Sequence, residues 1–438
     1  MNHHVTQLSL FSEAEMGRIS LEEGLAAFRQ CLKGKLNTHE GLAYLKGYMG
    51  ETVRLINSIN DQSYQLSRFI CFVSFRPVLR EIFGSKFVDR VCDTILANKL
   101  MPLLDQQLVD DNYSTRKGKG ALYGVMRVYE MIRKESEDYT QDCWILKDDI
   151  KSFFMTISKS RSMQLWDSFI RENYHEPDLE LLIATMRKII FFRPELNCIR
   201  KGVSSVKAGI PADKILGSLG PDRGFPVGKI ISQMTALLIL DMIDHIVTFV
   251  WKIRNGHYMD DRIMVNKSRQ KLINAKSQTD QMHRDIDLRT HPKKTYLQHY
   301  SKGVLFGGAM ILPGRIYLSN RTVGNCFRRL AVYNEYARTV DGFVEFYAEN
   351  FAQVVNSYLG QMCHYAEWNT MHRVIREIAP EWYKVMTVVG KKGRYKILVH
   401  PLYCQRKMVV RKHRCRMITL LGNDDNRRSL RQTARERQ

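Results

Sequence analysis

Apolar residues recur at helical spacing near the start of the chain. Residues three and four apart lie on one face of a helix, so this spacing predicts helices between about Ile19 and Asn60. We therefore expect a helical N-terminal region over residues 1–68. The pattern rests on Leu21, Leu25, Phe28 and Leu32, followed by Leu42, Leu45, Met49, Val53 and Ile56.

Short runs of β-branched and aromatic residues then predict strands among further helices. The first run is Arg68–Phe75, and a second is Cys143–Ile150. Strands and helices mixed in this order indicate an α+β fold with an antiparallel sheet. Further strands are predicted at 303–310 and 315–318, and helices at about 87–104, 120–134, 160–192, 229–250, 267–287 and 321–378.

The segment Gly256–Val265 carries two adjacent carboxylates, Asp260 and Asp261, between apolar residues. Asn255-Gly256 just before it is a turn signal, which predicts a strand, a tight turn and a strand. Two carboxylates at a hairpin tip repel each other unless a cation holds them, and such oxygen ligands suit Mg²⁺. Alone this pattern is weak, because Tyr-x-Asp-Asp also occurs on ordinary surface loops.

A third carboxylate strengthens the prediction. Asp149 ends an apolar strand about 110 residues before the hairpin. If the strand and the hairpin are neighbours in a sheet, the three carboxylates reach two metal ions, an arrangement suited to in-line phosphoryl displacement. Asp148 is the alternative, but neighbours on a strand face opposite ways. We choose Asp149 because Phe153 and Phe154 then follow at offsets four and five.

The charge balance points to a polyanionic partner. The chain has 67 Lys and Arg against 45 Asp and Glu, a net charge of +22, and nucleic acid is the leading candidate. Over residues 381–438 there are 16 Lys and Arg against 4 Asp and Glu. Aromatic and β-branched residues interleave with the cations from Tyr383 to Leu421, so we predict a basic RNA-binding extension, whereas Asn423–Gln438 reads as a disordered tail.

Other signals restrict the class of protein. No segment approaches the roughly 18 to 20 continuous apolar residues of a membrane span, and the N-terminus shows no secretory signal. Nine cysteines are scattered singly, which suits a reducing cytoplasm. His400, Cys404, His413 and Cys415 match no strong zinc spacing and lie among Lys and Arg that favour nucleic acid.

A series of motifs in order resembles those of reverse transcriptases, specifically bacterial group II intron-like enzymes. The resemblance is closest to the clade of diversity-generating retroelement reverse transcriptases. Asp149–Phe154 resembles motif A, Gly224–Gln233 motif B, Tyr258–Asp261 motif C, Lys293–Thr295 motif D and Gly303–Gly308 the primer grip; Arg80 to Arg90 and Tyr113–Gly120 resemble fingers motifs. The clade is also similar in Trp144–Lys147, His291–Val304, Gly314–Thr322 and Ser357–Gly360.

The resemblance implies a right-hand polymerase with fingers and palm over residues 69–310, a helical thumb over 311–380 and the basic extension over 381–438. Such an enzyme makes cDNA from an RNA template and dNTPs, here by error-prone synthesis in a diversity-generating retroelement. Defence-associated reverse transcriptases, which make cDNA against phage, share the same core and are the alternative. A catalytically silent RNA-binding scaffold is the rival, and three intact carboxylates argue against it. An accessory protein or a homo-oligomer is a further expectation.

The resemblance also assigns roles to single residues. Asp149, Asp260 and Asp261, with the carbonyl of Ile150, would hold two Mg²⁺ ions, for which Mn²⁺ could substitute. Phe154 would lie under the incoming sugar and exclude a 2′-hydroxyl, or it is an ordinary core aromatic. Arg80 would grip the triphosphate, or it forms a surface salt bridge. Lys294 would lie near the pyrophosphate, with Lys293 an equal contender.

Motif B and the basic loops complete the prediction. Gly228 would let the backbone approach the templating base, supported by Gln233. Val227 either loosens base selection or only packs. Asp148, Lys229 and Arg262 depart from the pattern of the clade. Predicted RNA-binding residues are Arg116, Lys117, Lys119, Lys391, Lys392, Arg394, Arg411 and Lys412.

Overall fold

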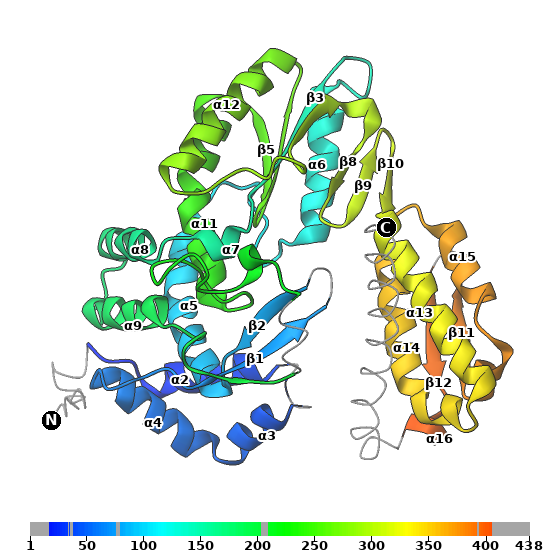
Figure 1. The fold of residues 1–438 in the computed structure, drawn as a ribbon, viewed down its shortest axis with the longest axis horizontal. Helices are drawn as coiled ribbons and strands as arrows, with labels where there is room; N and C mark the ends of the chain where they lie inside the picture. Colours follow the sequence, from blue (N-terminus) through cyan, green and yellow to red (C-terminus); the bar gives the residue numbers. More distant parts are fainter. Residues whose placement is uncertain are drawn as a thin grey trace, which may run out of the picture. The chain divides into compact units, whose positions relative to one another are not determined.

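The protein is described by a computed structural model over residues 17–33, 35, 38–75, 79–202, 209–391 and 394–404. The chain forms two compact units, Met1–His299 and Tyr300–Gln438 (Figure 1). Helices and mainly antiparallel strands occur together in it, which agrees with the predicted α+β class. The division falls after His299, whereas the sequence placed a boundary after residue 310.

Three helices follow each other at the start of the first unit, as predicted. The first, α2, begins at Ser20, whose side chain accepts from the Glu23 N–H while the Glu23 carboxylate accepts from the Ser20 N–H. This capping box satisfies donors that a helix start otherwise leaves unpaired. The three helices pack against α5 (Phe87–Gln107), so the N-terminal region shares the core of the first unit. They are α2 (Leu21–Leu32), α3 (His39–Lys46) and α4 (Tyr48–Asn60).

A three-stranded sheet has the order β2-β1-β4. β1 (Phe69–Ser74) is the predicted strand, and β2 (Arg80–Gly84) pairs with it antiparallel. β4 (Cys198–Arg200) pairs parallel to β1 and comes from a stretch with no periodic pattern. Its strand conformation depends on a partner more than 120 residues away in sequence, which local patterns do not reveal.

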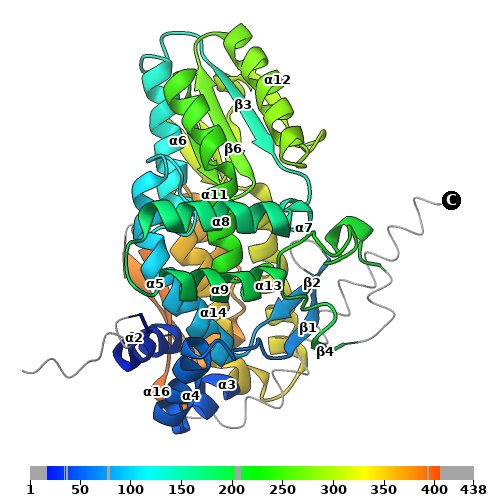
Figure 2. The ribbon, with the colours of Figure 1, turned by 90° about the vertical axis from the view of Figure 1, so that its left-hand side faces the viewer.

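The four-stranded sheet has the order β5-β6-β3-β7 and is antiparallel throughout. Its register places Asp149 opposite Asp261. The helices α6 and α12 pack against its strands (Figures 1 and 2). The elements are β3 (Trp144–Asp149), β5 (Arg254–Tyr258), β6 (Asp261–Asn266), β7 (Tyr296–His299), α6 (Ala121–Glu135) and α12 (Arg269–Asp285).

The central helix α11 (Ile230–His245) continues into a π-helical turn, η2 (Ile246–Val250). By length and composition Ile230–Val250 could cross a membrane, which the sequence analysis did not recognise. However, 72% of this stretch is buried inside the protein, as expected of a core helix. α8 (Lys159–Asn173) packs against α11, and α9 (Leu179–Phe191) lies beside α8 (Figure 2). The unit also contains α7 (Phe153–Thr156) and η1 (Ala212–Lys214).

The second unit begins with a three-stranded antiparallel meander and continues as helices around Trp382. The Trp382 ring stacks on Phe351 with 3.9 Å between ring centroids. Asn356 of α14 accepts from the N–H and donates to the carbonyl of Ile397. The elements are η3 (Tyr300–Lys302), β8 (Val304–Phe306), β9 (Ala309–Leu312), β10 (Arg315–Leu318), α13 (Asn320–Thr339), α14 (Phe343–Met362), α15 (Trp368–Arg376), η4 (Pro380–Lys384), β11 (Met386–Lys391), β12 (Arg394–Val399) and α16 (Pro401–Cys404).

This core changes the predicted division of the C-terminal half. β11 and β12 form an antiparallel hairpin in which Met386 pairs with Val399 and Lys391 with Arg394. Trp382 and Ile397 are buried with the helices that were assigned to the thumb. Residues 381–404 are therefore part of the second unit rather than a separate extension.

Candidate active site

The hairpin of β5 and β6 turns at Met259 and Asp260, because Tyr258 pairs with Asp261. The predicted turn at Asn255-Gly256 is wrong, since both residues lie inside β5. Gly256 serves close packing instead. A Cβ there would lie 2.9 Å from the Tyr113 hydroxyl and 3.1 Å from Val128 Cγ2.

The tip of the hairpin has an unusual backbone. Met259 has a φ of +58°, a region that side chains other than glycine seldom adopt. Its N–H donates to the Ser114 Oγ at 2.6 Å, and Ser114 is fully buried. Strain of this kind persists where surrounding contacts fix the conformation. The loop Tyr113–Gly120 therefore helps to hold the tip.

The strand and the hairpin are neighbours, as predicted. Asp149 is paired with Asp261 across the β3–β6 ladder. The N–H of Ile150 donates to the carbonyl of Asp260 at 3.1 Å. The three carboxyl groups of Asp149, Asp260 and Asp261 are thus carried by directly adjacent backbone.

The electrostatics of this cluster favour added positive charge. Burial, followed by the charge of Asp149, raises the pKa of Asp260. Burial also raises the pKa of Asp261, although the nearby Lys147 ammonium opposes this shift. The Lys147 Nζ lies 3.0 Å from an Asp261 oxygen. Two lysines already supply part of the charge, because the Lys294 Nζ lies 3.0 and 2.9 Å from the two oxygens of Asp149.

Two ambiguities of the sequence are decided by these contacts. Asp148 is turned away from the cluster, where its carboxylate accepts from the Thr295 hydroxyl at 3.3 Å and burial raises its pKa. Asp149 is therefore the member of the pair that shares the cluster. Both Lys293 and Lys294 are exposed, and the contact with Asp149 is made by Lys294.

The motif B segment lies against the helix that follows Asp149. The N–H of Phe225 donates to the carbonyl of Phe154 at 2.7 Å, and the Phe154 ring is half-buried against the core. Gly228 has a φ of +93° with no atom within 4 Å of a built Cβ, so the space beside it is open. Val227 packs against the core. The Gln233 Oε1 accepts from the Thr115 hydroxyl at 3.1 Å, which joins this helix to the Tyr113–Gly120 loop.

A family model described as reverse transcriptase (RNA-dependent DNA polymerase) matches residues 79–311, more than half of the chain. The chain belongs to the reverse transcriptase family. It is an RNA-directed DNA polymerase, with RNA as template and dNTPs as substrates. A search of curated proteins found no match.

Reverse transcriptases generally use divalent metals, and the donor chemistry of this site fits such ions. Three carboxylates, which are hard oxygen donors, are carried by adjacent backbone, and two of them have raised pKa values. Within the described residues, however, no group of three Asp, Glu, His or Cys is close enough to hold an ion. Lys294 occupies both oxygens of Asp149. Binding an ion at Asp149 would therefore require the Lys294 ammonium to move away.

Arg80 and Arg116 differ in how many contacts their guanidinium groups make within the protein. Arg80 lies in β2, and its buried Nε has no hydrogen-bond partner among the described residues. The buried Arg116 guanidinium, by contrast, donates to the carbonyls of Val109 and Asn112 at 2.7 and 3.1 Å and pairs with Asp105. These contacts hold Arg116 inside the loop, and its contact with RNA stays a prediction.

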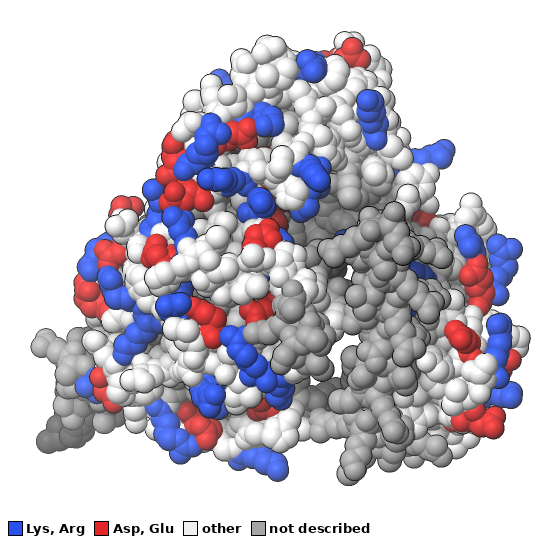
Figure 3. Space-filling view, in the orientation of Figure 1, with Lys and Arg blue, Asp and Glu red and all other residues white. Residues whose placement is uncertain are grey.

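The remaining predicted RNA-binding residues fall into three groups. Lys119 pairs with Asp110 at 2.9 Å, and Lys117 is exposed. Arg394 is exposed on β12. On the face in Figure 3, Lys and Arg are interspersed with Asp and Glu over both described units. The side chain of Lys391 and the whole of Lys392, Arg411 and Lys412 lie outside the described residues.

The three departures from the clade pattern have partners inside the first unit. Lys229 is buried, with its Nζ 3.1 Å from Asp93 Oδ1. Arg262 pairs with the buried Asp244 at 3.0 Å and stands opposite Asp148 in the β3–β6 register. Lys229 and Arg262 therefore belong to internal ion pairs, whereas Asp148 accepts from the Thr295 hydroxyl.

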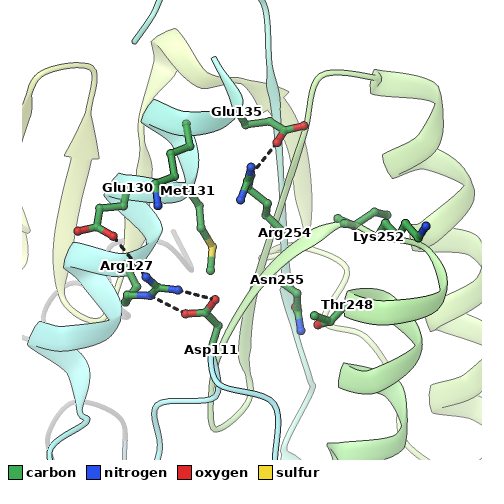
Figure 4. A pocket seen from close by; sticks show the side chains of 11 residues that line it. Asp111, Arg127, Glu130, Met131, Glu135, Thr248, Lys252, Arg254 and Asn255 are labelled. Atoms are coloured by element: carbon green, nitrogen blue, oxygen red, sulfur yellow. Dashed lines mark hydrogen bonds and ion pairs between the residues drawn. The ribbon is translucent and has the colours of Figure 1, made fainter. Parts of the chain in front are cut away.

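A pocket of about 360 Å³ lies beside β5 rather than at the carboxylates (Figure 4). Arg127 pairs with Asp111 at 2.7 Å, and Arg254 with Glu135 at 2.8 Å, along its wall. Asn255 and Thr248 face each other at its inner end (Figure 4). Two of the four cationic side chains that line the pocket are thus paired with carboxylates of the same wall.

Sequence reasoning missed several residues around the site. Lys147 could have been found, because it lies two positions before Asp149 on the same strand and so faces the same side. Ser114 and Asp244 carry no such signal. Their contacts to the hairpin join residues 145 and 18 positions apart.

Proposed function

We propose that this reverse transcriptase makes cDNA from a cognate RNA by two-metal nucleotidyl transfer at Asp149, Asp260 and Asp261. The observation that carries the proposal is the meeting of these carboxyl groups on adjacent strands beside Lys294. Two Mg²⁺ ions, or Mn²⁺ in their place, would be held by the three carboxylates and the Ile150 carbonyl and would activate the primer 3′-hydroxyl and the leaving pyrophosphate.

The neighbouring residues bind and orient the nucleotide in this proposal. Arg80, on β2, contacts the triphosphate through its guanidinium group. Phe154 lies under the sugar, and the open backbone at Gly228 accepts the base pair, with Gln233 supporting it from the helix. Lys294 moves from Asp149 toward the pyrophosphate, where its charge offsets that of the leaving group. The first unit supplies fingers and palm, and helices of the second supply the thumb.

The decisive experiment compares Asp260→Ala with the parent in Mg²⁺-dependent dNTP incorporation on RNA. The control is Asp285→Ala, which removes an exposed carboxylate from α12. We expect the parent and the control to extend the primer and Asp260→Ala to lose activity. Equal inertness of all three with the cognate RNA supplied would contradict the proposal.

For the biological setting, we propose error-prone synthesis in a diversity-generating retroelement. Support comes from the similarity in motif B, where Val227 packs on the core and offers no polar contact beside Gly228. Val227→Gln should then lower the substitution rate in sequenced cDNA, whereas Val227→Leu should not. An unchanged error rate in Val227→Gln would reject this role of Val227.

Defence against phage is the alternative setting, because defence-associated enzymes share the same core. The gene neighbourhood separates the two. A variable-repeat target gene with a small accessory protein supports diversification, and a defence island supports immunity. In either setting we propose a cytoplasmic enzyme that acts with an accessory protein or as a homo-oligomer.

A further inference from the structure

One buried carboxylate connects both strands of the catalytic hairpin with the segment that precedes Ser114. Asp244 lies near the end of α11 and is fully buried. Its Oδ1 accepts from the Arg262 Nη2 at 3.0 Å and from the Asn255 Nδ2 at 3.2 Å. Its Oδ2 accepts from the His257 Nδ1 at 2.8 Å and from the Asn112 Nδ2 at 3.3 Å. All four donor residues are themselves buried.

The residues that donate to Asp244 lie close in sequence to the hairpin tip or to Ser114, which contacts the tip. His257 lies two residues before Met259 on β5, and Arg262 directly follows Asp261 on β6. Asn112 lies two residues before Ser114, whose hydroxyl accepts from the Met259 N–H. Asp244 therefore holds both arms of the hairpin and the segment that contacts its strained tip.

The helix that carries Asp244 also begins at motif B. α11 starts at Ile230, two residues after Gly228, and its interior is buried. A rigid helix between Gly228 and Asp244 fixes the distance between the open backbone at motif B and the hairpin. Small misplacements of reacting groups cost large factors in rate, so such a connection matters beyond stability.

The strength of the connection comes from charge. Arg262 and His257 together lower the pKa of Asp244, which stays ionised despite its burial. A buried ion pair with several additional hydrogen bonds resists displacement, and loss of one partner leaves an uncompensated charge. Neutralising Asp244 would leave the Arg262 guanidinium without its carboxylate.

We propose that Asp244 is a positioning residue that sets Asp260 and Asp261 for catalysis by holding β5, β6 and Asn112 on α11. The inference rests on the proposed polymerase function. Asp244 touches neither substrate nor the reacting carboxylates, so it acts through the backbone of the hairpin.

The test compares Asp244→Asn with Asp241→Asn. Asp241 is equally buried, lies one turn earlier on the same helix, and binds Gln107 and His245 rather than the hairpin. The measurements are kcat, the Mg²⁺ concentration at half-maximal activity, the thermal midpoint, and hydrogen exchange of the peptide 256–265. Exchange is followed without Mg²⁺, so it reports on the hairpin independently of activity.

We expect Asp244→Asn to lower kcat by about 10- to 100-fold, to raise the Mg²⁺ midpoint and to speed hydrogen exchange at the hairpin. Asp241→Asn should lower the thermal midpoint without these changes. If both variants show the same kcat, Mg²⁺ midpoint and hairpin exchange, the positioning role is wrong and Asp244 serves stability alone.

A second variant covers the case in which Asp244→Asn does not fold. His257→Phe removes one donor and keeps the Asp244–Arg262 pair. His257→Phe should raise the Mg²⁺ midpoint and speed hydrogen exchange at the hairpin. If neither the Mg²⁺ midpoint nor the exchange rate changes, the inference is overturned. If the parent is as inert as Asp260→Ala, the proposed function is rejected, and this inference with it. If the parent is active and the Asp244 variants show no effect on the hairpin, only the positioning role of Asp244 is rejected.

Discussion

The carboxyl group of Asp260 lowers the stability of the fold, because it is buried beside Asp149 and its pKa is raised. A raised pKa means that the folded state holds the proton more tightly than the unfolded state. The destabilisation is therefore present at neutral pH and shrinks as the pH falls through the raised pKa toward the ordinary value of 3.8.

Asp260→Asn should accordingly raise the free energy of unfolding by about 1 kcal/mol at pH 7. The gain should diminish when urea unfolding is repeated at successively lower pH. Asp285→Asn, at an exposed position, provides the control. A loss of stability in Asp260→Asn, or a gain that grows on acidification, would show that nearby positive charge, such as that of Lys294, stabilises the carboxylate.

Phe154 allows a test of sugar selection. The ring is half-buried and its backbone is tied to Phe225, so its position is fixed. Phe154→Ala should open space for a 2′-hydroxyl and lower the preference for dNTP over rNTP by about 10-fold or more in primer extension. Phe153→Leu changes the adjacent buried ring and should leave this preference unchanged. Continued exclusion of rNTP by Phe154→Ala would place the gate elsewhere.

At the scale of single residues, strand alternation predicted that Asp148 and Asp149 face opposite ways, and their different contacts agree with this. Alternation did not say which of the two joins the cluster, and Asp149 was chosen from its spacing to Phe153 and Phe154. No periodicity separates Lys293 from Lys294 in an irregular segment, so their difference emerged only from the contact with Asp149. Asp244 was not predicted, since its four partners are brought together by the sheet.

At the scale of elements, the loop Tyr113–Gly120 shows why composition misleads. Its cations suggested RNA contact, yet Arg116 is buried against backbone carbonyls while Lys117 is exposed. A buried guanidinium that satisfies several carbonyls is structural, whereas an exposed ammonium remains available to phosphate. Composition also misled at Asn255-Gly256, which suggested a turn. The glycine instead permits close packing of β5 against Tyr113.

These two residues form a matched pair for experiment. Arg116→Ala should reduce the free energy of unfolding by about 2 kcal/mol, because buried carbonyls lose their donor. Lys117→Ala should leave stability unchanged and weaken RNA binding with a smaller salt dependence. Urea unfolding and RNA titrations at several salt concentrations measure both. Weakened RNA binding in Arg116→Ala at full stability would support the predicted contact of Arg116 with RNA.

At the scale of the whole molecule, the sequence predicted the α+β class and the pairing of the carboxylate strands, but its domain boundaries differ from the structure. Motif positions set the predicted boundaries at 310 and 380. Packing sets the observed division at 299, and Trp382 and Ile397 complete the core of the second unit. Contacts such as Asn356 with Ile397 join distant segments, which motif order does not encode.

The core of the second unit defines a sharper test of the basic C-terminal region. Removing residues 381–438 would delete Trp382, which is fully buried and stacked on Phe351, and should unfold the second unit. A chain that ends at Cys404 keeps this core and loses 11 Lys and Arg against 3 Asp and Glu. Released counterions make RNA affinity salt-dependent in proportion to the phosphates neutralised. The chain ending at Cys404 should therefore keep the thermal midpoint, bind RNA more weakly and show a flatter salt dependence. The same salt slope as the full chain would mean that residues 405–438 do not contact RNA.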